Sequence, residues 1–376
     1  MRFLTADYLF PLHTNPIKNG VLQISDDGQV IAIFKNRGEV NQDKLEIFNG
    51  ILCPGFVNAH CHLELSHLKG RAEKGQGFLE FSKTISLRDN YSVAAKKQAI
   101  ENAEQEMITN GIVGVGDICN KIDTLQKKQK ENLKYYNFIE TFGVDLNKVD
   151  TVFNQAIELR NKFRFAGQKA SIVPHAPYSV PPVLMKKINN FFDDTDELLT
   201  IHMQETNEEN QLFEYKKGAF FDWLNSMNAC LSIWGSRNKP TDILQELSGK
   251  KILLVHNTFA KKEDITENYY CTCPRANLFI ENNLPDYSIF DADKLCVGTD
   301  SLASNNSLSI LDEIIVIQNN SNFDLNTLLK ISSKNGAKAL GFEQLGTFEK
   351  GKVPGVNLIK NMDGLKFTPD CFIQII

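Results

Sequence analysis

The chain has 376 residues and a mass of 42.4 kDa, long enough to bury a large core in a single barrel domain. Hydrophobic residues make up 42% and charged residues 23%, and the formal net charge of -5 argues against a nucleic-acid partner. No apolar run reaches membrane length and no charged and apolar leader opens the sequence, so we expect no membrane association. The eight cysteines lack the spacing of a disulfide framework and predict reduced thiols in a cytoplasmic protein.

The two ends of the chain are predicted to be β-structure. Short strand-like runs occupy residues 6–12, 20–24 and 30–34, and Asp26-Asp27-Gly28 predicts a hairpin turn before the last of them. These runs are too few for a sandwich of their own. Residues 346–351, 356–359 and 371–376 are also strand-like. We therefore expect residues 1–52 and 345–376 to form one composite β-sandwich.

Between the two ends, residues 53–344 alternate between strands and helices. Eight strands are predicted, the first beginning within the preceding segment: 51–57, 111–118, 135–141, 171–175, 198–202, 252–256, 269–273 and 295–300. Eight such units predict an α/β fold of the (β/α)8 TIM-barrel type, whose chemistry lies at the carboxyl ends of the strands. An open doubly wound sheet would instead need a glycine-rich turn after the first strand, and Pro-Gly-Phe-Val at 54–57 is not such a turn.

Histidines cluster at these strand ends. His60 and His62 follow the first strand, and because strand residues i and i+2 share a face, both imidazoles are expected to point the same way. They are half of a metal site, or two unrelated polar residues at a strand terminus. The chain has only seven histidines, and His175, His202 and His256 also end apolar runs. This distribution favours a shared site.

His60, His62, His202 and Asp300 would together offer three imidazole nitrogens and one carboxylate. That donor set suits one zinc ion, or iron(II), and leaves a position for water, whose pKa the ion lowers towards neutrality. A second ion would normally need a bridging ligand, often a modified lysine on the fourth strand. Lys169 stands at the base of that strand and none stands at its end, so one metal ion is expected.

Glu205, three residues after His202, is the candidate proton donor. It could instead cap the next helix, because Thr206 and Asn207 are cap-like residues. His256 could hold the hydroxide in line, and His175 and Asn277 could meet polar atoms of a substrate. His256, His175 and Asn277 could each instead be a polar residue at a strand end whose hydrogen bonds are made within the protein.

Two segments are longer than a bare barrel needs. Residues 66–92 follow the first histidine pair and predict a lid or a surface excursion. Residues 207–249 contain both tryptophans, Trp223 and Trp234, and the run 213–224 has helical spacing. Its aromatic residues would form a small core above the barrel mouth, which predicts a helical cap.

Taken together, these motifs resemble the amidohydrolase superfamily, and within it the branch of mononuclear amino-purine deaminases and chlorohydrolases. The matching stretches are residues 54–62, 174–179, 202–205, 255–257, 273–277, 298–306, 335–341 and 346–352. The resemblance implies that His60, His62, His202 and Asp300 bind the metal and that Glu205 shuttles protons. It also implies that His256 partners the hydroxide and that Asp300 takes the first proton from the water.

Within that branch the chain is similar to the aminodeoxyfutalosine deaminases, which act on a 6-aminopurine nucleoside with a modified ribose in menaquinone synthesis. The similarity lies in Leu-Glu-Leu-Ser at 63–66 and in the aromatic segment after the fifth strand. Glu64 could bind the ribose or a purine edge, or orient a ligand histidine. Family members are often dimers, so a homodimer is compatible with the resemblance.

Several functions compete. The first is metal-dependent hydrolytic deamination of a 6-aminopurine nucleoside, a small-molecule substrate, with release of ammonia. The second is deamination of guanine, another nucleobase or S-adenosylhomocysteine, or hydrolytic dechlorination. The third is a catalytically dead barrel that acts as a binding protein, which the presence of all four candidate ligands and both proton-handling residues disfavours.

Overall fold

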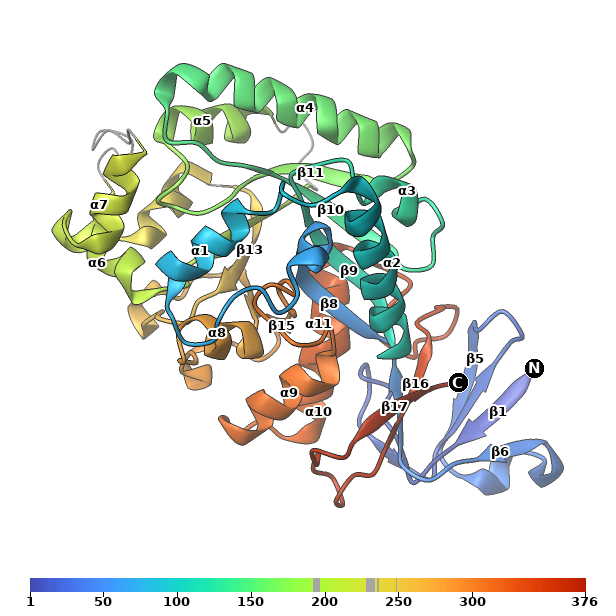
Figure 1. Cartoon of the computed structure of the whole chain (residues 1–376). Helices are drawn as coiled ribbons and strands as arrows, with labels where there is room; N and C mark the ends of the chain where they lie inside the picture. The colour runs from blue at the N-terminus through green and yellow to red at the C-terminus, as the bar shows by residue number, and fades with distance from the viewer. Residues whose placement is uncertain (192–196, 228–233, 235–236, 248) are drawn as a thin grey trace.

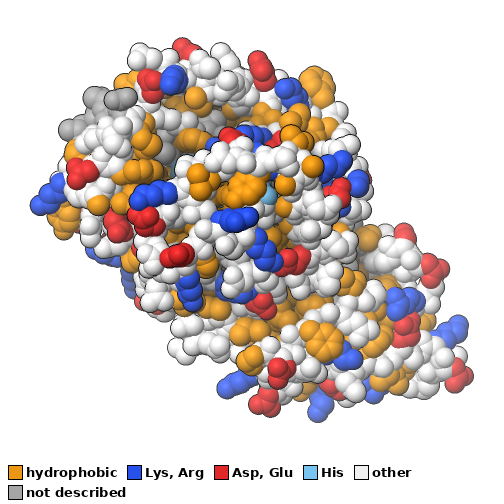
Figure 2. Space-filling model, viewed as in Figure 1, with side chains coloured by type: hydrophobic (Ala, Val, Ile, Leu, Met, Phe, Trp, Pro, Cys, Tyr) orange, Lys and Arg blue, Asp and Glu red, His pale blue; other side chains and the backbone are white. Residues whose placement is uncertain are grey.

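The computed structural model describes residues 1–191, 197–227, 234, 237–247 and 249–376. It has a larger α/β part and, at one end, a smaller β part that holds both chain termini (Figure 1). No helix among the described residues is long and apolar enough to span a lipid bilayer. Acidic and basic side chains are interspersed over the face in Figure 2, without a large field of one sign. The seven described cysteines are free thiols.

Both ends of the chain contribute to the smaller part. One sheet has the order β5-β4-β1-β6 and the other β17-β16-β7-β2-β3. Their strands are β1 (Arg2–Thr5), β2 (Tyr8–Leu9), β3 (Ile17–Lys18), β4 (Val21–Ile24), β5 (Val30–Phe34), β6 (Leu45–Ile47), β7 (Ile51–Pro54), β16 (Val356–Lys360) and β17 (Phe372–Ile375). The expected strand at 346–351 is absent, but Phe348 packs into the core that the two sheets share.

The predicted first strand, 51–57, is not one strand. Its first half is β7, which pairs with β16 and β2, and its second half belongs to β8 (Phe56–Cys61), which pairs with β9. The break is at Gly55, where a Cβ would lie 2.5 Å from Val113 Cγ1 and 2.8 Å from the Pro354 carbonyl oxygen. Only glycine fits this close approach, so the chain passes from one sheet system to the other there.

The larger part contains two four-stranded parallel sheets, with orders β11-β10-β9-β8 and β12-β13-β14-β15. Their strands are β8, β9 (Ile112–Cys119), β10 (Lys134–Thr141), β11 (Lys169–Pro174), β12 (Leu198–Met203), β13 (Lys251–His256), β14 (Tyr269–Thr272) and β15 (Leu295–Val297). The sheets meet at both edges. The His202 amide donates to the His175 carbonyl at 2.9 Å, and the Thr299 and Asp300 amides donate to the His60 carbonyl at 3.1 Å.

Helices follow most of these strands and pack around the sheets (Figure 1). They are α2 (Val93–Thr109), α3 (Leu125–Lys128), α4 (Val149–Phe165), α5 (Pro182–Phe191), α8 (Pro274–Ile280), α9 (Ile310–Asn319), α10 (Leu325–Leu329) and α11 (Asn335–Leu340), with a π-helical turn, η9, at Lys330–Lys334. Short 3-10 helices are η1 (Arg37–Glu39), η2 (Gln42–Lys44), η3 (Leu63–Leu68), η4 (Leu146–Lys148), η6 (Pro240–Leu247), η7 (Lys262–Asp264) and η8 (Tyr287–Ile289). Capping side chains begin several of the helices, as Ser92 does for α2 and Ser309 for α9.

The two long excursions also contain helices: α1 (Phe78–Ser86) in the first, and α6 (Asn207–Tyr215) and α7 (Ala219–Ser226) in the second. The single helix expected over 213–224 is broken, because Lys216 is left-handed (φ 51°) and Gly218 has a φ of 103°. Aromatic residues of both excursions, including Phe78, Phe213 and Phe220, form an apolar cluster separate from the main core. Residues 228–233, 235–236 and 248 of the expected cap lie outside the described residues.

Candidate active site

Three histidines from two sheets converge at the carboxyl ends of their strands. His60 lies in β8, His62 follows it, and His202 lies near the end of β12. The Nε2 atom of His62 is 3.2 Å from Nε2 of His60 and 3.2 Å from Nε2 of His202. Two nitrogens that each lie about 2.0–2.1 Å from a tetrahedral zinc ion are roughly 3.3–3.4 Å apart. The spacing of these nitrogens therefore fits a shared divalent ion.

The Asp300 carboxylate completes the cluster. Its Oδ1 lies 3.6 Å from Nε2 of His60 and 3.4 Å from Nε2 of His62, and its Oδ2 accepts a hydrogen bond from Ser304. Asp300 has a left-handed backbone (φ 56°), which is costly for a residue other than glycine. The main-chain bond from its amide to the His60 carbonyl fixes this conformation and aims the carboxylate at the histidines.

The ionisation states of these residues suit metal binding. Burial lowers the pKa of the His62 imidazole to about 3 and also lowers the pKa of His60 and His202, so the rings are neutral at pH 7. Burial alone would raise the pKa of Asp300, but its interactions with His60 and the neighbouring histidines outweigh burial and leave that pKa below its ordinary value. Neutral imidazole and ionised carboxylate are the forms that bind a cation.

Two groups contact the His202 ring at Nδ1, on the side away from the cluster. Its Nδ1 donates to the His175 carbonyl oxygen at 2.9 Å, which leaves Nε2 unprotonated and directed at the cluster. The Glu140 carboxylate, at the end of β10, has its Oε1 3.5 Å from the same Nδ1. A carboxylate or carbonyl behind a ligand histidine fixes its tautomer and orientation.

Glu205 and His256 face each other beside the cluster. His256 Nδ1 donates to Asn277 Oδ1 at 2.8 Å, so its Nε2 carries no proton and lies 3.6 Å from Glu205 Oε1. Burial, reinforced by the charge of Asp300, raises the pKa of the Glu205 carboxyl well above its ordinary value. The protonated form of Glu205 is therefore favoured relative to that of an exposed glutamate. Thr206, and not Glu205, caps the next helix, because the Thr206 hydroxyl accepts a hydrogen bond from the Glu208 amide.

The remaining predicted residues occupy different positions. His175 borders the cavity described below, and its Nδ1 lies 2.7 Å from Ser179 Oγ. Asn277 is buried behind His256. Glu64 does not border the cavity: its Oε2 accepts the amides of Asn120 and Lys121, each at 3.0 Å, and burial raises its pKa to about 7.

A cavity of about 510 Å³ opens above this cluster. His62, His202, Glu205, His256 and Asp300 form part of its lining, and His175 forms another part. Its size is within the range of about 300–1,000 Å³ that small-molecule sites occupy. Both long excursions border it, through Phe78, Phe81, Ile85 and Arg88 of the first and Trp223, Leu224 and Met227 of the second.

Sequence analysis did not single out Glu140, Ser304 or Arg88. Glu140 could have been found, because it stands one residue before the end of the predicted strand 135–141, next to the strand-end position from which His202 was chosen. Ser304 and Arg88 lie in loops, where no periodicity indicates which way a side chain points.

A model of the amidohydrolase family matches residues 51–370. The chain belongs to this family. It is therefore a hydrolytic enzyme, and its histidine-rich cluster could hold a metal ion. The resemblance that the strand-end motifs predicted is confirmed.

Comparison with known proteins also finds purine nucleoside deaminases. Over 325 residues the chain is 28% identical to an adenosine deaminase of Helicobacter pylori, covering 81% of this chain and 77% of the relative. It is 25% identical over 341 residues to an aminodeoxyfutalosine deaminase of Nitratiruptor sp., covering 87% and 83%. The crystal structure of Helicobacter pylori aminofutalosine deaminase in complex with methylthio-coformycin superposes with a TM-score of 0.81 at 24% identity, covering 98% of this chain and 94% of that one. This structural similarity shows the fold.

Proposed function

We propose that the protein hydrolytically deaminates a 6-aminopurine nucleoside and releases ammonia. The observation that carries this proposal is the position of the Glu205 carboxyl, buried in the cavity lining beside a convergent set of imidazoles, where burial raises its pKa well above the ordinary value. Replacement of an amino group on a purine ring needs an activated water and a separate acid for the ring nitrogen. Relatives that deaminate adenosine-like nucleosides support the same reaction class.

His60, His62, His202 and Asp300 would hold one divalent ion, and zinc suits their donor set best. When bound, such an ion lowers the pKa of a coordinated water towards neutrality and so supplies a nucleophile at pH 7. The protein supplies the geometry. The His175 carbonyl holds the ring of His202 in a single tautomer, and the side-chain amide of Asn277 does the same for His256.

Proton handling falls to three residues. Glu205 donates its proton to a ring nitrogen of the purine, because its raised pKa favours the protonated acid. His256 accepts a hydrogen bond from the attacking water at its unprotonated Nε2. Asp300, ionised and beside the histidines, accepts the first proton of that water. His175 is assigned to direct substrate binding, and Asn277 and Glu64 are assigned to it through the groups that they support, His256 and the backbone at Asn120.

We also propose that the two parallel sheets form one closed (β/α)8 barrel over residues 53–344. Hydrogen bonds join β12 to His175, the residue after β11, and join β8 to the residues after β15, and these bonds support closure at both seams. Residues 1–52 and 345–376 form the attached β-sandwich. The helices within 207–249 act as a cap, as the position of Trp223 and Leu224 in the cavity lining suggests.

The substrate that we favour is aminodeoxyfutalosine, which would place the protein in menaquinone synthesis. Ammonia release by the zinc-loaded protein should be measured in parallel on aminodeoxyfutalosine, adenosine, S-adenosylhomocysteine and guanine. Rapid release from the first and none from guanine is the expected result. Equal turnover of guanine would favour a nucleobase deaminase. Absence of release from all four substrates at full metal occupancy would refute purine deamination and leave a chlorohydrolase or a binding protein.

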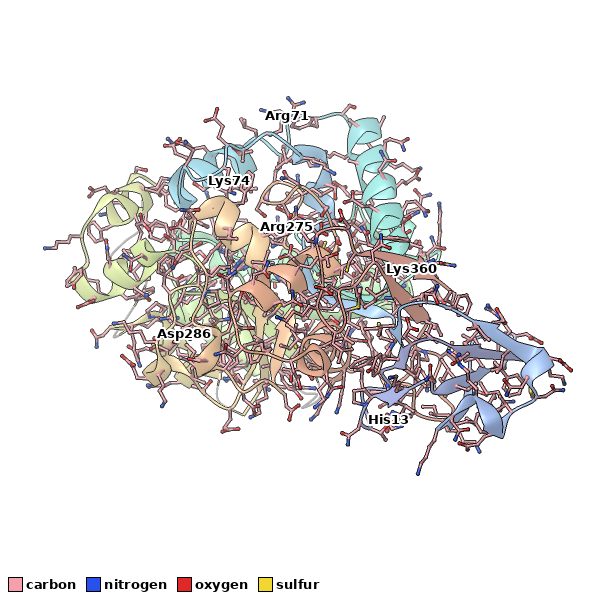
Figure 3. The ribbon with its side chains drawn as sticks, turned by 90° about the horizontal axis from the view of Figure 1, so that it is seen from below. His13, Arg71, Lys74, Arg275, Asp286 and Lys360 are labelled. Atoms are coloured by element: carbon pink, nitrogen blue, oxygen red, sulfur yellow. The ribbon has the colours of Figure 1, made fainter. Side chains whose placement is uncertain are left out.

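His62→Ala should abolish stable metal binding, because it removes one of three convergent imidazoles without opening the main core. Zinc measured by mass spectrometry after dialysis should fall from about one equivalent per chain to well below that value. The matched control is His13→Ala. His13 is exposed in the smaller β part (Figure 3) and is not among the convergent ligands, so its replacement should leave the zinc content unchanged. Full zinc retention by His62→Ala would remove His62 from the ligand set.

A further inference from the structure

Glu209 is a buried carboxyl that the proposed chemistry does not use. It lies in α6, the helix that follows β12 and Glu205, and its side chain is 0% exposed. Its Oε2 accepts a hydrogen bond from the Glu205 amide at 3.2 Å. Its Oε1 is also buried and has no hydrogen-bond partner among residues 1–191, 197–227, 234, 237–247 and 249–376.

A carboxyl in this position is unfavourable for folding. Moving a polar oxygen from water into the interior without a compensating hydrogen bond costs free energy, and an apolar side chain of similar size would avoid that cost. Burial raises the pKa of the Glu209 carboxyl well above its ordinary value, and the charge of Glu205 raises it further, so the neutral form is favoured. What the carboxyl provides in return is an acceptor for the Glu205 amide.

The turn between β12 and α6 needs such a contact. Gln204, the residue before Glu205, has a left-handed backbone (φ 48°), a conformation that persists in a non-glycine residue only where its surroundings determine it. The Gln204 side chain donates to Asp264 Oδ2 at 2.9 Å, and its carbonyl accepts the Phe259 amide at 3.1 Å. Glu209 holds the next amide along the turn. Contacts on both sides of the chain therefore fix its direction where it enters the active site.

We propose that Glu209 is a positioning residue, which holds the Glu205 amide and thereby aims the Glu205 carboxyl at the substrate. This inference rests on the proposed function, in which Glu205 protonates the purine ring. A general acid must lie within hydrogen-bond reach of the atom that it protonates, and a misplacement of about 1 Å can cost about a hundredfold in rate. Glu209 does not border the cavity, so it acts through Glu205 and not on the substrate.

The first test compares three variants of α6. Glu209→Leu removes the acceptor and should lower kcat by about a hundredfold with little change in KM, because the cavity keeps its lining. Glu209→Gln keeps an oxygen for the Glu205 amide and should retain most of the wild-type kcat. Glu214→Leu, the same change at an exposed position of the same helix, is the control and should leave kcat unchanged. A wild-type kcat in Glu209→Leu would overturn the inference.

Stability and metal content separate positioning from packing. Glu209→Leu removes one unpartnered oxygen and leaves one unpartnered amide, so it should unfold at about the wild-type urea concentration and keep its zinc. A large loss of stability accompanied by loss of zinc would make the role of Glu209 structural and overturn the inference.

A double variant tests whether Glu209 acts through Glu205. In the Glu205→Gln background, Glu209→Leu should lower kcat little further, because a side chain without an acidic proton gains nothing from being aimed. A further loss as large as that in the wild-type background would refute the inference.

Hydrogen exchange of the Glu205 amide, measured by NMR, tests the contact without any substrate. The amide should be protected in wild type and in Glu209→Gln, and should exchange faster in Glu209→Leu. That result supports the inference even if no substrate releases ammonia, in which case only the proposed reaction fails. Unchanged protection in Glu209→Leu refutes the inference whatever the outcome of the ammonia assay.

Discussion

Glu205→Gln should lower kcat for deamination by about a hundredfold to ten-thousandfold, the usual contribution of a positioned general acid. Glutamine keeps the size of the side chain and its contacts in the wall but has no acidic proton to give to the purine nitrogen. Glu205 is not among the convergent ligands, so the variant should retain its zinc, and KM should change little because the cavity keeps its shape. Steady-state ammonia release and metal analysis on the same sample check both statements.

The pH profile provides a second readout of the same residue. Burial and the charge of Asp300 raise the pKa of Glu205, so its protonated, active form persists above the ordinary range of a glutamic acid. Wild-type kcat/KM should therefore decline on the alkaline side as this proton is lost, and Glu205→Gln should lack that decline. Glu214→Gln, on an exposed position of α6, is the control and should behave as wild type. A Glu205→Gln variant with full turnover would exclude Glu205 as the acid.

Much of the candidate site could be predicted because the carboxyl ends of parallel strands gather at the same edge of a sheet. His60, His62, His202, His256 and Asp300 were each chosen as polar residues that close an apolar run, and the structure brings all five together. That inference needs only the period of two along a strand and the common direction of the strands. It does not need any knowledge of the helices.

The errors of prediction came from features that periodicity does not encode. The run 51–57 is continuously apolar because both sheet systems are buried, so hydrophobicity alone could not show that the chain changes sheets at Gly55. The break between α6 and α7 depends on the backbone conformation of Lys216, and no side-chain pattern announces it. The role of Glu64 was left open between binding substrate and orienting a ligand histidine, and no side-chain pattern indicates the contacts that its carboxylate makes with the Asn120–Lys121 backbone.

Lys128 shows most clearly what the sequence conceals. It lies in Gln-Lys-Lys-Gln-Lys at 126–130, a stretch that is typical of an exposed surface. The structure instead buries it, with 1% of its surface accessible, where Nζ pairs with Asp117 and donates to Asn137 Oδ1 at 2.7 Å. Burial would lower the pKa of this ammonium, but the charge of Asp117 outweighs burial and raises it. The pair is therefore ionic.

This ion pair supports the metal cluster through the backbone. Asp117 Oδ1 accepts the amide of Leu63 at 2.8 Å, and Leu63 directly follows His62. The contact fixes the turn that leaves β8 and thereby the direction of the His62 ring. Because both charges are buried, neither can be removed alone without leaving the other uncompensated.

Lys128→Met should therefore lower the free energy of unfolding by about 3–5 kcal/mol, the usual loss when one partner of a buried ion pair is removed. Urea denaturation followed by circular dichroism measures this change. Zinc affinity should also fall, by about tenfold to a hundredfold, because the backbone that carries His62 loses its support. Lys130→Met, at an exposed position two residues further on, should change neither quantity.

The double variant Asp117→Asn with Lys128→Met distinguishes a buried charge from a simple loss of packing. Asparagine keeps an oxygen for the Leu63 amide and leaves no unpaired carboxylate, so the double variant should regain most of the stability that Lys128→Met loses. If the double variant is as unstable as Lys128→Met, the loss comes from the packing of the lysine side chain against Tyr135 and Phe163. If the double variant regains both stability and zinc affinity, the damage in Lys128→Met comes from the uncompensated charge of Asp117. The neutralised Asp117 side chain then keeps its contact with the Leu63 amide, and that contact holds His62 in place.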